Sequence, residues 1–532
     1  MYSQVNTAII RGIDSQLVLV EADVSDGMPL FEMVGFLSAE VKEARERVRT
    51  SLRNIGFQLP IKRITVNISP ASIRKSGTGF DLPVAIAILA AIGVIGQERL
   101  ADITATMQES IAAVADIITV GELGLDGKIN PVSGVLPIMM EAKRAGLTSA
   151  VIPRANLREA ALVDGLRLLS VDHLEDVIRY LGGKCELRRE REKTEEFTSR
   201  VRQSNHPVEA ESYDFKNIRG QKSLRRACEI AVSGGHNLLM IGPPGAGKTM
   251  VARSIPGILP PMTREEELEL SKIYSVCGLL TDGGQLMKRR PFRAPHHTIS
   301  PAGLIGGGLI PKPGEISLAN GGVLFLDELP EFDRATIETL RQPMEEGRVR
   351  IVRQQADVEY PADFMLVAAM NPCPCGYFPE KKRCHCRPSQ VRDYLGKISQ
   401  PLLDRIDLCA NASPVSFDDL IREEAAESSA SILDRVLQTR QIQRKRFAGS
   451  GIVCNSQIPA SELKKYCTLG TEEENYLRLC YERLGLTARG YGRLLRVART
   501  IADMTASERI HREHLQEARI YHGLDRNYWK NV

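Results

Sequence analysis

The sequence lacks a hydrophobic run long enough to span a lipid bilayer. Its longest apolar stretch, LPVAIAILAAIGVIG at residues 82–96, is shorter than the roughly 20 residues that a membrane-spanning helix needs. A signal-peptide pattern is also missing, because the first residues, MYSQVNTAII, do not place a basic segment before an apolar one. We therefore expect a cytoplasmic protein without a membrane partner, in which residues 82–96 form a buried helix.

The sequence also lacks the regular cysteine spacing of a disulfide framework, and it lacks a strong net charge. Four of the eleven cysteines lie close together and the others are scattered singly, which suits a reducing compartment. The formal net charge is only +4 over 532 residues, so binding of nucleic acid would require local basic patches. With 43% hydrophobic and 26% charged residues, the chain has the composition of a globular protein and the length of two to four domains.

The composition along the chain divides it into three folded parts. Residues 184–212 are highly charged and lack aliphatic periodicity, which is typical of an exposed linker after a first block, 1–183. Strand-like and helical runs then alternate over 213–415, which predicts an α/β domain with a largely parallel sheet. Residues 416–532 have apolar residues at helical spacing and predict a helical domain. Short internal repeats and low-complexity tracts are not found.

The clearest chemical motif is a glycine-rich loop between a strand and a helix, NLLMIGPPGAGKTMVARSI. It fits the pattern G-x-x-x-x-G-K-[ST], in which backbone N–H groups surround phosphates. Lys248 would reach the β and γ oxygens, and the Thr249 hydroxyl would bind Mg²⁺. The alternative is a chance glycine-rich turn, which the flanking strand and helix disfavour. The predicted nucleotide-binding residues are Gly242, Pro243, Pro244, Gly245, Ala246, Gly247, Lys248, Thr249 and Met250.

Two later apolar strands end in polar residues. In GGVLFLDELPEF the strand leads to Asp327 and Glu328, at the end of a parallel sheet where ligands bind. We expect Asp327 to bind Mg²⁺ and Glu328 to polarise the attacking water. The strand FMLVAAMNP ends in Asn371, whose neutral amide could orient that water. The alternative for each is a strand that simply ends in solvent.

The order of these motifs, followed by PLLDRIDL, resembles the AAA+ ATPases. RPFRAPHHTISPAGLIGGG and LTARGYGRLLRVARTIADM narrow the resemblance to the ComM/YifB-type magnesium chelatase-like proteins, over essentially the whole chain. The resemblance implies a P-loop α/β core with a helical lid, ATP and Mg²⁺ as cofactors, and a homo-oligomeric, hexameric ring. It also implies DNA, single-stranded or branched, as a partner, and an ATP-driven helicase for branch migration during natural transformation and recombination. The alternatives are a magnesium-chelatase ATPase subunit and an AAA+ unfoldase.

The same resemblance assigns roles to two arginines. Arg405 in LLDRID would be the arginine finger, which reaches the ATP of a neighbouring subunit and stabilises charge on the γ-phosphate. Arg489 in TARGYGR would be the second sensor arginine, with Arg493 one turn later as the substitute. The alternative for each arginine is an ordinary surface salt bridge.

Two basic segments resemble the DNA-gripping hairpins of related helicases. Residues 306–318 correspond to a helix-2 insert with Lys312 at its tip, and residues 347–364 to a pre-sensor hairpin that contains Arg350 and turns near Arg353. Basic side chains on such hairpins would bind DNA phosphates without sequence preference. The alternative is a solvated hairpin that has no DNA partner.

The N-terminal block resembles the catalytic domain of Lon protease, an α/β fold like that of some ribosomal proteins, in segments such as VNISPASIRKSGTGFDLPVAIAIL. Lon chemistry requires a serine nucleophile and a lysine base. The serine register falls on Gly79, and the lysine register falls on the apolar residues 135–138. The resemblance therefore implies a Lon-like fold without peptidase activity.

The clustered cysteines lie in NPCPCGYFPEKKRCHC, directly after the Asn371 strand. Their spacing is C-x-C-x₈-C-x-C, from Cys373, Cys375, Cys384 and Cys386. Four thiolates suit a closed, structural zinc site, in which His385 could replace one sulfur. A reduced, metal-free loop is the alternative.

Overall fold

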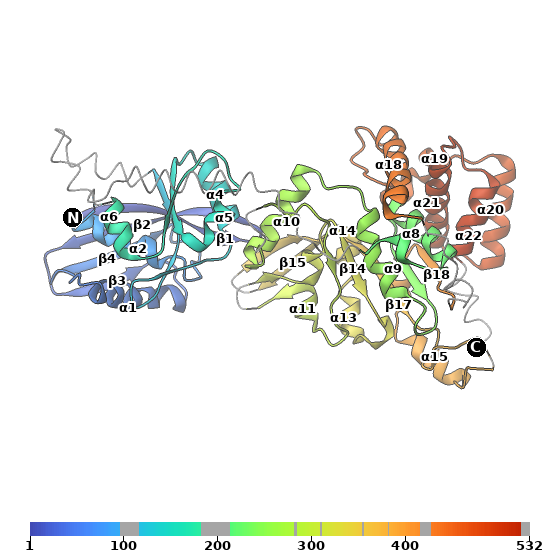
Figure 1. The fold of residues 1–532 in the computed structure, drawn as a ribbon, viewed down its shortest axis with the longest axis horizontal. Coiled ribbons are helices and arrows are strands. Elements are labelled where there is room, and N and C mark those ends of the chain that lie inside the picture. Colours follow the sequence, from blue (N-terminus) through green and yellow to red (C-terminus); the bar gives the residue numbers. More distant parts are fainter. Residues whose placement is uncertain are drawn as a thin grey trace.

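The protein is elongated, with a sheet at each of two places along its length and a group of helices at the far end (Figure 1). The linker expected at residues 184–212 lies outside the residues that this computed structural model describes, which are 1–95, 116–181, 213–280, 285–308, 311–353, 356–380, 382–414 and 427–522.

The N-terminal part is built on a seven-stranded mixed sheet of order β3-β4-β2-β1-β5-β8-β9. Its strands are β1 (Tyr2–Arg11), β2 (Asp14–Ser25), β3 (Leu30–Val34), β4 (Arg63–Ser69), β5 (Ile117–Thr119), β8 (Ser149–Pro153) and β9 (Arg167–Val171). Its helices are α1 (Ala39–Asn54), α2 (Asp81–Ala91), α4 (Val135–Arg144), α5 (Leu157–Ala160), α6 (Leu174–Leu181) and the 3₁₀ turn η2 (Arg154–Asn156), and a small ribbon pairs β6 (Glu122–Leu123) with β7 (Ile129–Asn130).

Helix α2 is the buried helix that the apolar run predicts. Ten of its residues are buried, since it contacts β1 and β2 on one side and α1 on another. A helix that is apolar on all sides is stable in water only inside a core. Within the described residues, no helix combines the length and the apolar character needed to cross a membrane.

The central part contains the parallel sheet that the alternating pattern predicts. Its strand order is β11-β14-β17-β10-β18 and every pairing is parallel. Each residue of β10, β14 and β17 is buried, as expected for strands covered on both faces. The strands are β10 (Leu238–Ile241), β11 (Phe292–Arg293), β14 (Val323–Leu326), β17 (Met365–Met370) and β18 (Leu408–Asn411).

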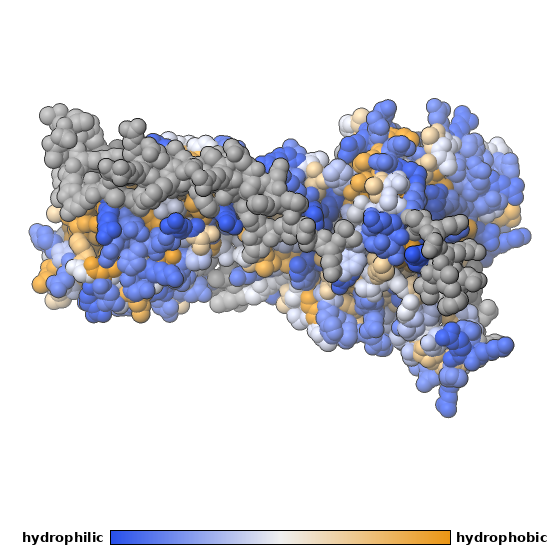
Figure 2. Space-filling model, in the orientation of Figure 1, coloured by the Kyte–Doolittle hydropathy of each residue, from blue (hydrophilic) through white to orange (hydrophobic). Residues whose placement is uncertain are grey.

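Helices and two hairpins surround this sheet. The hairpins are β12 (Gly306–Gly307) with β13 (Lys312–Pro313), and β15 (Arg348–Arg353) with β16 (Ala356–Pro361). The helices are η3 (Phe215–Asn217), α8 (Lys222–Gly234), α9 (Lys248–Ser254), η4 (Ile255–Ile258), α10 (Arg264–Val276), α11 (Pro301–Ile305), α12 (Glu315–Leu318), η5 (Leu329–Glu331), α13 (Arg334–Glu338), α14 (Arg341–Glu346), α15 (Pro388–Gly396) and α16 (Gln400–Leu403). Helix α15 projects from the body (Figure 1), and the visible face of this projection is mainly hydrophilic (Figure 2).

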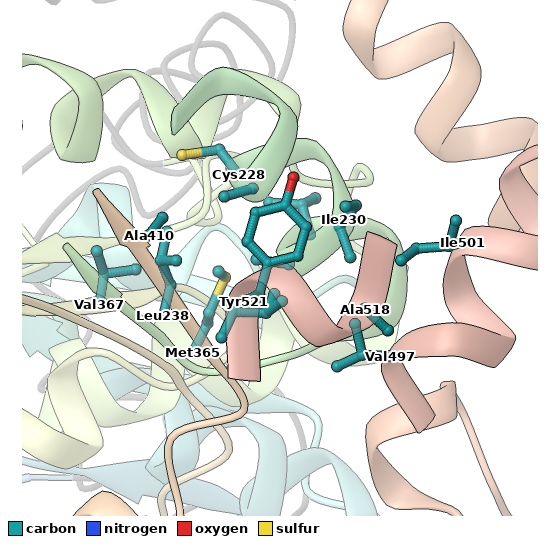
Figure 3. Packing of buried hydrophobic residues seen from close by; sticks show 14 of the residues in the cluster. Cys228, Ile230, Leu238, Met365, Val367, Ala410, Val497, Ile501, Ala518 and Tyr521 are labelled. Carbon is teal, nitrogen blue, oxygen red and sulfur yellow. The ribbon is translucent and has the colours of Figure 1, made fainter. Parts of the chain in front are cut away.

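The C-terminal part is helical, as the periodicity predicts. It contains α18 (Ser429–Arg446), η6 (Asn455–Gln457), η7 (Ala460–Glu462), α19 (Leu463–Tyr466), α20 (Thr471–Leu484), α21 (Ala488–Met504) and α22 (Arg512–His522). These helices share one hydrophobic core with the central sheet. Figure 3 shows the ring of Tyr521 from α22 among Cys228 of α8, Leu238 of β10 and Val497 of α21. These helices therefore pack directly against the strand that leads into the glycine-rich loop.

The N-terminal part joins the central part at helix α10. The backbone N–H of Gly134 donates to the Ser275 carbonyl at 2.9 Å, and the Ser275 hydroxyl donates to Glu159 Oε1 at 2.5 Å. Asp14, at the turn between β1 and β2, pairs with Lys272 at 2.8 Å. This junction brings the β1–β2 turn close to the β15–β16 hairpin, where a Cβ at Gly12 would lie 3.3 Å from the Glu359 carbonyl oxygen.

Candidate ATP-binding and hydrolysis site

Strand register places three of the predicted site segments at one edge of the central sheet. Ile241 pairs with Met370, so the glycine-rich loop after β10 and Asn371 after β17 start side by side. Leu326 pairs with Ala368, which places Asp327 at the same edge. Because all three strands are parallel, their carboxyl ends meet where ligands of such sheets bind.

Lys248 lies at the centre of this edge. Its side chain is 8% exposed, and its Nζ donates to the carbonyl oxygens of Gly242 at 2.5 Å and Pro243 at 3.1 Å, and to Asn371 Oδ1 at 3.0 Å. Burial lowers the pKa of Lys248, while the carboxylates of Asp327 and Glu328 oppose that shift. All three acceptors are neutral, so an anionic phosphate would be a stronger partner for this ammonium group.

The two predicted magnesium ligands face each other across the site. Thr249 Oγ1 donates to Asp327 Oδ2 at 2.8 Å. One hydroxyl and one carboxylate fit Mg²⁺, which takes few ligands from the protein and completes its octahedron with water and substrate phosphates. When bound there, Mg²⁺ would neutralise charge on the phosphate oxygens.

Glu328 has a left-handed backbone, with φ of 52°. Such a conformation costs a non-glycine residue about 1–2 kcal/mol, and the backbone N–H of Glu328 donates to Asp327 Oδ1 at 3.0 Å in compensation. The side chain is exposed at the site edge. The geometry separates the two adjacent carboxylates, one directed toward Thr249 and the other toward solvent.

The structure adds two contacts to the glycine-rich loop that the sequence did not indicate. The Gln221 side chain donates to the Ala246 carbonyl at 3.1 Å, from a residue whose φ of 54° is also left-handed. Gly376, in the cysteine loop, lies so close to Pro244 that a Cβ there would be 2.4 Å from Pro244 Cδ. The sequence signal for the Gln221 contact was the Gly220-Gln221 pair directly before α8. The Gly376 contact had no sequence signal, because it joins segments that are far apart along the chain.

Arg405 lies near the amino ends of the sheet strands, opposite the carboxyl ends that lead to the glycine-rich loop and Asn371. It precedes β18, whose Leu408 pairs with Leu238 at the start of β10, and Asn237 Nδ2 donates to the Arg405 carbonyl at 3.1 Å. The length of β10, at least about 10 Å, therefore separates Arg405 from the glycine-rich loop of its own chain. Its guanidinium, 11% exposed, forms an ion pair with Glu345 and donates to the Pro401 carbonyl at 2.6 Å.

The two candidate sensor arginines have different surroundings. Arg493 is buried, and its Nη1 donates to the carbonyls of Leu403 at 2.9 Å and Ile406 at 2.5 Å. Arg489, one turn earlier on α21, is exposed, with no ion pair or hydrogen bond among the described residues. Because Leu403 and Ile406 flank Arg405, this face of α21 lies on the Arg405 side of the molecule.

The two basic hairpins lie against each other. A Cβ at Gly306 of β12 would be 3.2 Å from Ile351 Cδ1 of β15, and the Tyr360 hydroxyl of β16 donates to the Pro311 carbonyl at 2.7 Å. Lys312 is exposed at the start of β13. Residues 309–310, next to it, and residues 354–355, where the sequence predicts a turn, lie outside the described residues.

The arginines of the second hairpin differ in their partners. Arg350 forms a two-pronged pair with Asp357 on the facing strand, with one contact at 2.9 Å. Arg353, at the end of β15, is exposed and has no ion pair within the described part of the chain. A basic side chain without an acidic neighbour is the better candidate for a phosphate contact.

The four clustered cysteines converge. Sγ of Cys373 lies 3.3 Å from Sγ of Cys375 and 3.8 Å from Sγ of Cys384, and the last two are 3.6 Å apart. With Cys386, all four sulfur atoms lie within 4.8 Å of one another. His385 is not part of this group.

Comparison with known proteins covers nearly the entire chain. Residues 214–420 match the family described as "Magnesium chelatase, subunit ChlI", residues 20–156 match "Subunit ChlI of Mg-chelatase", and residues 426–522 match "Magnesium chelatase, subunit ChlI C-terminal". The uncharacterized protein YifB of Salmonella typhimurium is 40% identical over 527 residues, which are 98% of this chain and 97% of YifB.

Two further relatives differ in how much they share. Competence protein ComM of Haemophilus influenzae is 39% identical over 516 residues, 97% of this chain and 96% of ComM. Lon protease 3 of Sorangium cellulosum is 23% identical over 186 residues, which are 33% of this chain and 20% of that protease.

Proposed function

The chain belongs to the magnesium chelatase-like family that includes YifB and the competence protein ComM, an AAA+ ATPase family, and we propose that it is an ATP-driven DNA motor. In this proposal a ring of subunits, a hexamer by family resemblance, hydrolyses ATP to move along single-stranded or branched DNA. The expected role is branch migration during homologous recombination, including the integration of DNA taken up in natural transformation.

The observation that carries the ATPase part is the meeting of Lys248, Thr249, Asp327 and Asn371 at one sheet edge. Lys248 and the loop N–H groups would bind the phosphates, and Thr249 and Asp327 would hold Mg²⁺. Glu328 would accept a proton from the attacking water, while Asn371 would orient that water.

The position of Arg405 supports catalysis between subunits. Since its own glycine-rich loop lies across the sheet, Arg405 would reach the ATP of a neighbour, which requires its guanidinium to leave Glu345. Arg489, exposed on the same side, would act on that same nucleotide, while Arg493 fixes α21 to the Arg405 segment. A head-to-tail contact of this kind gives a ring when the rotation from subunit to subunit closes.

The paired hairpins support DNA as the substrate of the motor. Lys312 and Arg353 are exposed basic residues on two neighbouring hairpins, and Arg350 is a further proposed contact whose charge Asp357 offsets. Tyr360 connects the hairpins, so both would move together when the sheet edge responds to ATP. The name of the ComM relative, a competence protein, agrees with this use of DNA.

The proposal also divides the chain into domains. Residues 1–183 would form a Lon-like domain without peptidase activity, 184–212 a linker, 213–415 the ATPase core and 416–532 the lid. In the Lon-like part Gly79 carries no nucleophile, and the first turn of α4 in the lysine register is apolar and buried. Its contacts with α10 and with the β15–β16 hairpin suit a role in assembly of the ring or in DNA binding.

The test is branch migration on a fluorescently labelled Holliday junction, measured with the purified full chain and ATP. We expect product to accumulate with ATP and not with a non-hydrolysable analogue, and Lys248→Ala to abolish it because phosphate binding is lost. Junctions and forks that stay intact under all conditions would overturn the motor assignment.

The family descriptions favour one second candidate, an ATPase subunit of magnesium chelatase. Such a subunit would support ATP-dependent insertion of Mg²⁺ into a porphyrin when mixed with its partner subunits, and DNA would leave its activity unchanged. Porphyrin metallation and branch migration, measured on the same preparation, distinguish the two.

A further inference from the structure

The cysteine loop, residues 372–386, connects two features that the ATPase proposal leaves unexplained. It begins directly after Asn371, and it carries four sulfur atoms that converge on one point. It also touches the glycine-rich loop through Gly376. We propose that Cys373, Cys375, Cys384 and Cys386 bind one zinc ion, and that the loop closed by this ion braces the glycine-rich loop in its phosphate-binding shape.

The sulfur geometry is that of a tetrahedral zinc site. With zinc–sulfur bonds of about 2.3 Å, the four sulfur atoms of a tetrahedron lie about 3.8 Å apart. The separations of 3.3, 3.6 and 3.8 Å among Cys373, Cys375 and Cys384 lie at or slightly below this value. They are far longer than the bond of about 2.05 Å in a disulfide.

Backbone N–H groups point at these sulfurs. Phe378 N lies 3.4 Å from Cys373 Sγ, and the N–H groups of Tyr377 and His385 donate to Cys375. Such bonds stabilise thiolates and orient metal ligands. The loop is further ordered by the Arg383 guanidinium, which lies 4.2 Å from the centre of the Tyr377 ring.

Zinc with four thiolates carries a net charge of −2, which a site in water must offset. Lys382, Arg383 and Arg387 lie in or directly after the loop. A closed site with four protein ligands leaves no open coordination position, so the ion would have a structural role.

The contact between Gly376 and Pro244 connects the cysteine loop to the glycine-rich loop. The φ of Gly376 is +86°, and any side chain there would overlap the Pro244 ring, with Cβ 2.4 Å from Cδ and 2.9 Å from Cγ. Pro244 lies in the middle of the glycine-rich loop, and Asn371 at the base of the cysteine loop accepts a hydrogen bond from Lys248. The cysteine loop therefore supports the phosphate-binding residues at two points, Pro244 and Lys248.

This role rests on the proposed ATP site, so the experiment measures zinc and nucleotide separately. The full chain is purified without added metal, its zinc content is measured by mass spectrometry, and its affinity for a fluorescent ATP analogue is titrated. We expect about one zinc per chain, and loss of zinc in Cys384→Ser but not in Cys277→Ser, a cysteine outside the cluster. Zinc well below one per chain, also after reconstitution with zinc alone, would overturn the site.

Gly376→Ala isolates the brace, because it keeps all four ligands. It should retain zinc and raise the dissociation constant for the ATP analogue at least about fivefold, since strain of this kind costs roughly a tenfold factor in equilibrium. Gly396→Ala, at the end of α15 where no atom lies near the new methyl group, should bind both zinc and nucleotide normally. Wild-type protein stripped of zinc by a chelator, with its fold checked by circular dichroism, should show the same weakened affinity.

The outcomes separate the two proposals. If the zinc-containing wild type binds ATP, and Gly376→Ala and the stripped protein bind it equally well, the brace is wrong while the ATP site stands. If the wild type contains zinc and binds no ATP, both the ATPase assignment and the brace are wrong, and the zinc site stands.

Discussion

At the scale of single residues, the two neighbouring carboxylates of the site, Asp327 and Glu328, differ in their hydrogen bonds. Asp327 accepts from Thr249, whereas Glu328 makes no side-chain bond within the described residues and points outward from a left-handed backbone. A carboxylate that makes no hydrogen bond to a predicted magnesium ligand is free to accept a proton from water. We therefore propose different chemical tasks for these two acidic residues, which are adjacent in the sequence.

The first prediction concerns Glu328. Glu328→Gln keeps the size of the side chain and removes its basicity, so ATP should bind with nearly unchanged affinity while hydrolysis falls by about 100-fold or more. Single-turnover hydrolysis and equilibrium binding, measured on the same sample, check this. Asp327→Asn is the matched comparison and should weaken Mg²⁺-dependent binding itself. A Glu328→Gln protein that hydrolyses ATP at the wild-type rate would remove Glu328 from the mechanism.

At the scale of elements, the two hairpins differ in how their charges are compensated. Arg348 and Arg350 pair across the hairpin with Glu359 and Asp357, which holds β15 against β16. Arg353 and Lys312 have no such partners within the described part of the chain. We therefore expect the ends of the hairpins to contribute more to DNA binding than their strands, where Asp357 offsets the charge of Arg350.

The second prediction tests this division. The double variant Lys312→Ala/Arg353→Ala should weaken binding to single-stranded DNA and lower the slope of log affinity against log salt by about 1 for each residue removed. The control Arg348→Ala/Glu359→Ala removes one positive and one negative charge of an ion pair on the same hairpin, so its salt slope should match the wild type. Fluorescence anisotropy at several salt concentrations gives both values. Equal losses in the two variants would show that the hairpins affect DNA only through the fold.

Elements that depend on local pattern could be predicted from the sequence. Four apolar residues followed by two acidic ones predict strand β14 and the position of Asp327. Basic and apolar residues that alternate up to Arg353 predict the hairpin of β15 and β16. The segment 306–318 was harder, because the hairpin uses only two residues on each strand and the chain then forms the short helix α12. Two-residue strands carry no periodicity to detect.

Contacts between distant segments could not be predicted. The Gly376–Pro244 contact and the Arg405–Glu345 pair join residues that only the three-dimensional fold brings together. The pairing of Arg350 with Asp357 was within reach, since a hairpin predicted to turn near Arg353 brings these side chains to one face, as the register of β15 and β16 does. The convergence of the four sulfurs was suggested by spacing, and the structure confirms the grouping.

At the scale of the whole molecule, the proposed function requires residues of two chains for each ATP site. The phosphate-binding residues and Arg405 lie at opposite ends of β10, and Arg493 connects α21 to the segment that carries Arg405. Each subunit would therefore supply the phosphate-binding residues of one ATP site and Arg405 to the ATP site of a neighbour. The shared core between sheet and helices keeps these halves in a fixed relation.

The third prediction follows from this division. Lys248→Ala and Arg405→Ala proteins should each be inactive, the latter because loss of an arginine finger costs about 10³-fold or more. Mixed in equal amounts, they should recover up to about one quarter of the wild-type ATPase rate, since head-to-tail pairing joins an intact loop to an intact Arg405 at that share of interfaces. A mixture of Lys248→Ala with the double variant Lys248→Ala/Arg405→Ala should stay inactive. A first mixture as inactive as its components would place Arg405 outside the neighbour's site.

The most direct test of the central claim is the steady-state ATPase rate of the purified full chain, measured with and without DNA. An ATP-driven DNA motor should hydrolyse ATP several-fold faster when single-stranded or branched DNA is present, and the Lys312→Ala/Arg353→Ala variant should lose that stimulation while keeping its basal rate. A wild-type rate that no form of DNA changes would contradict the account.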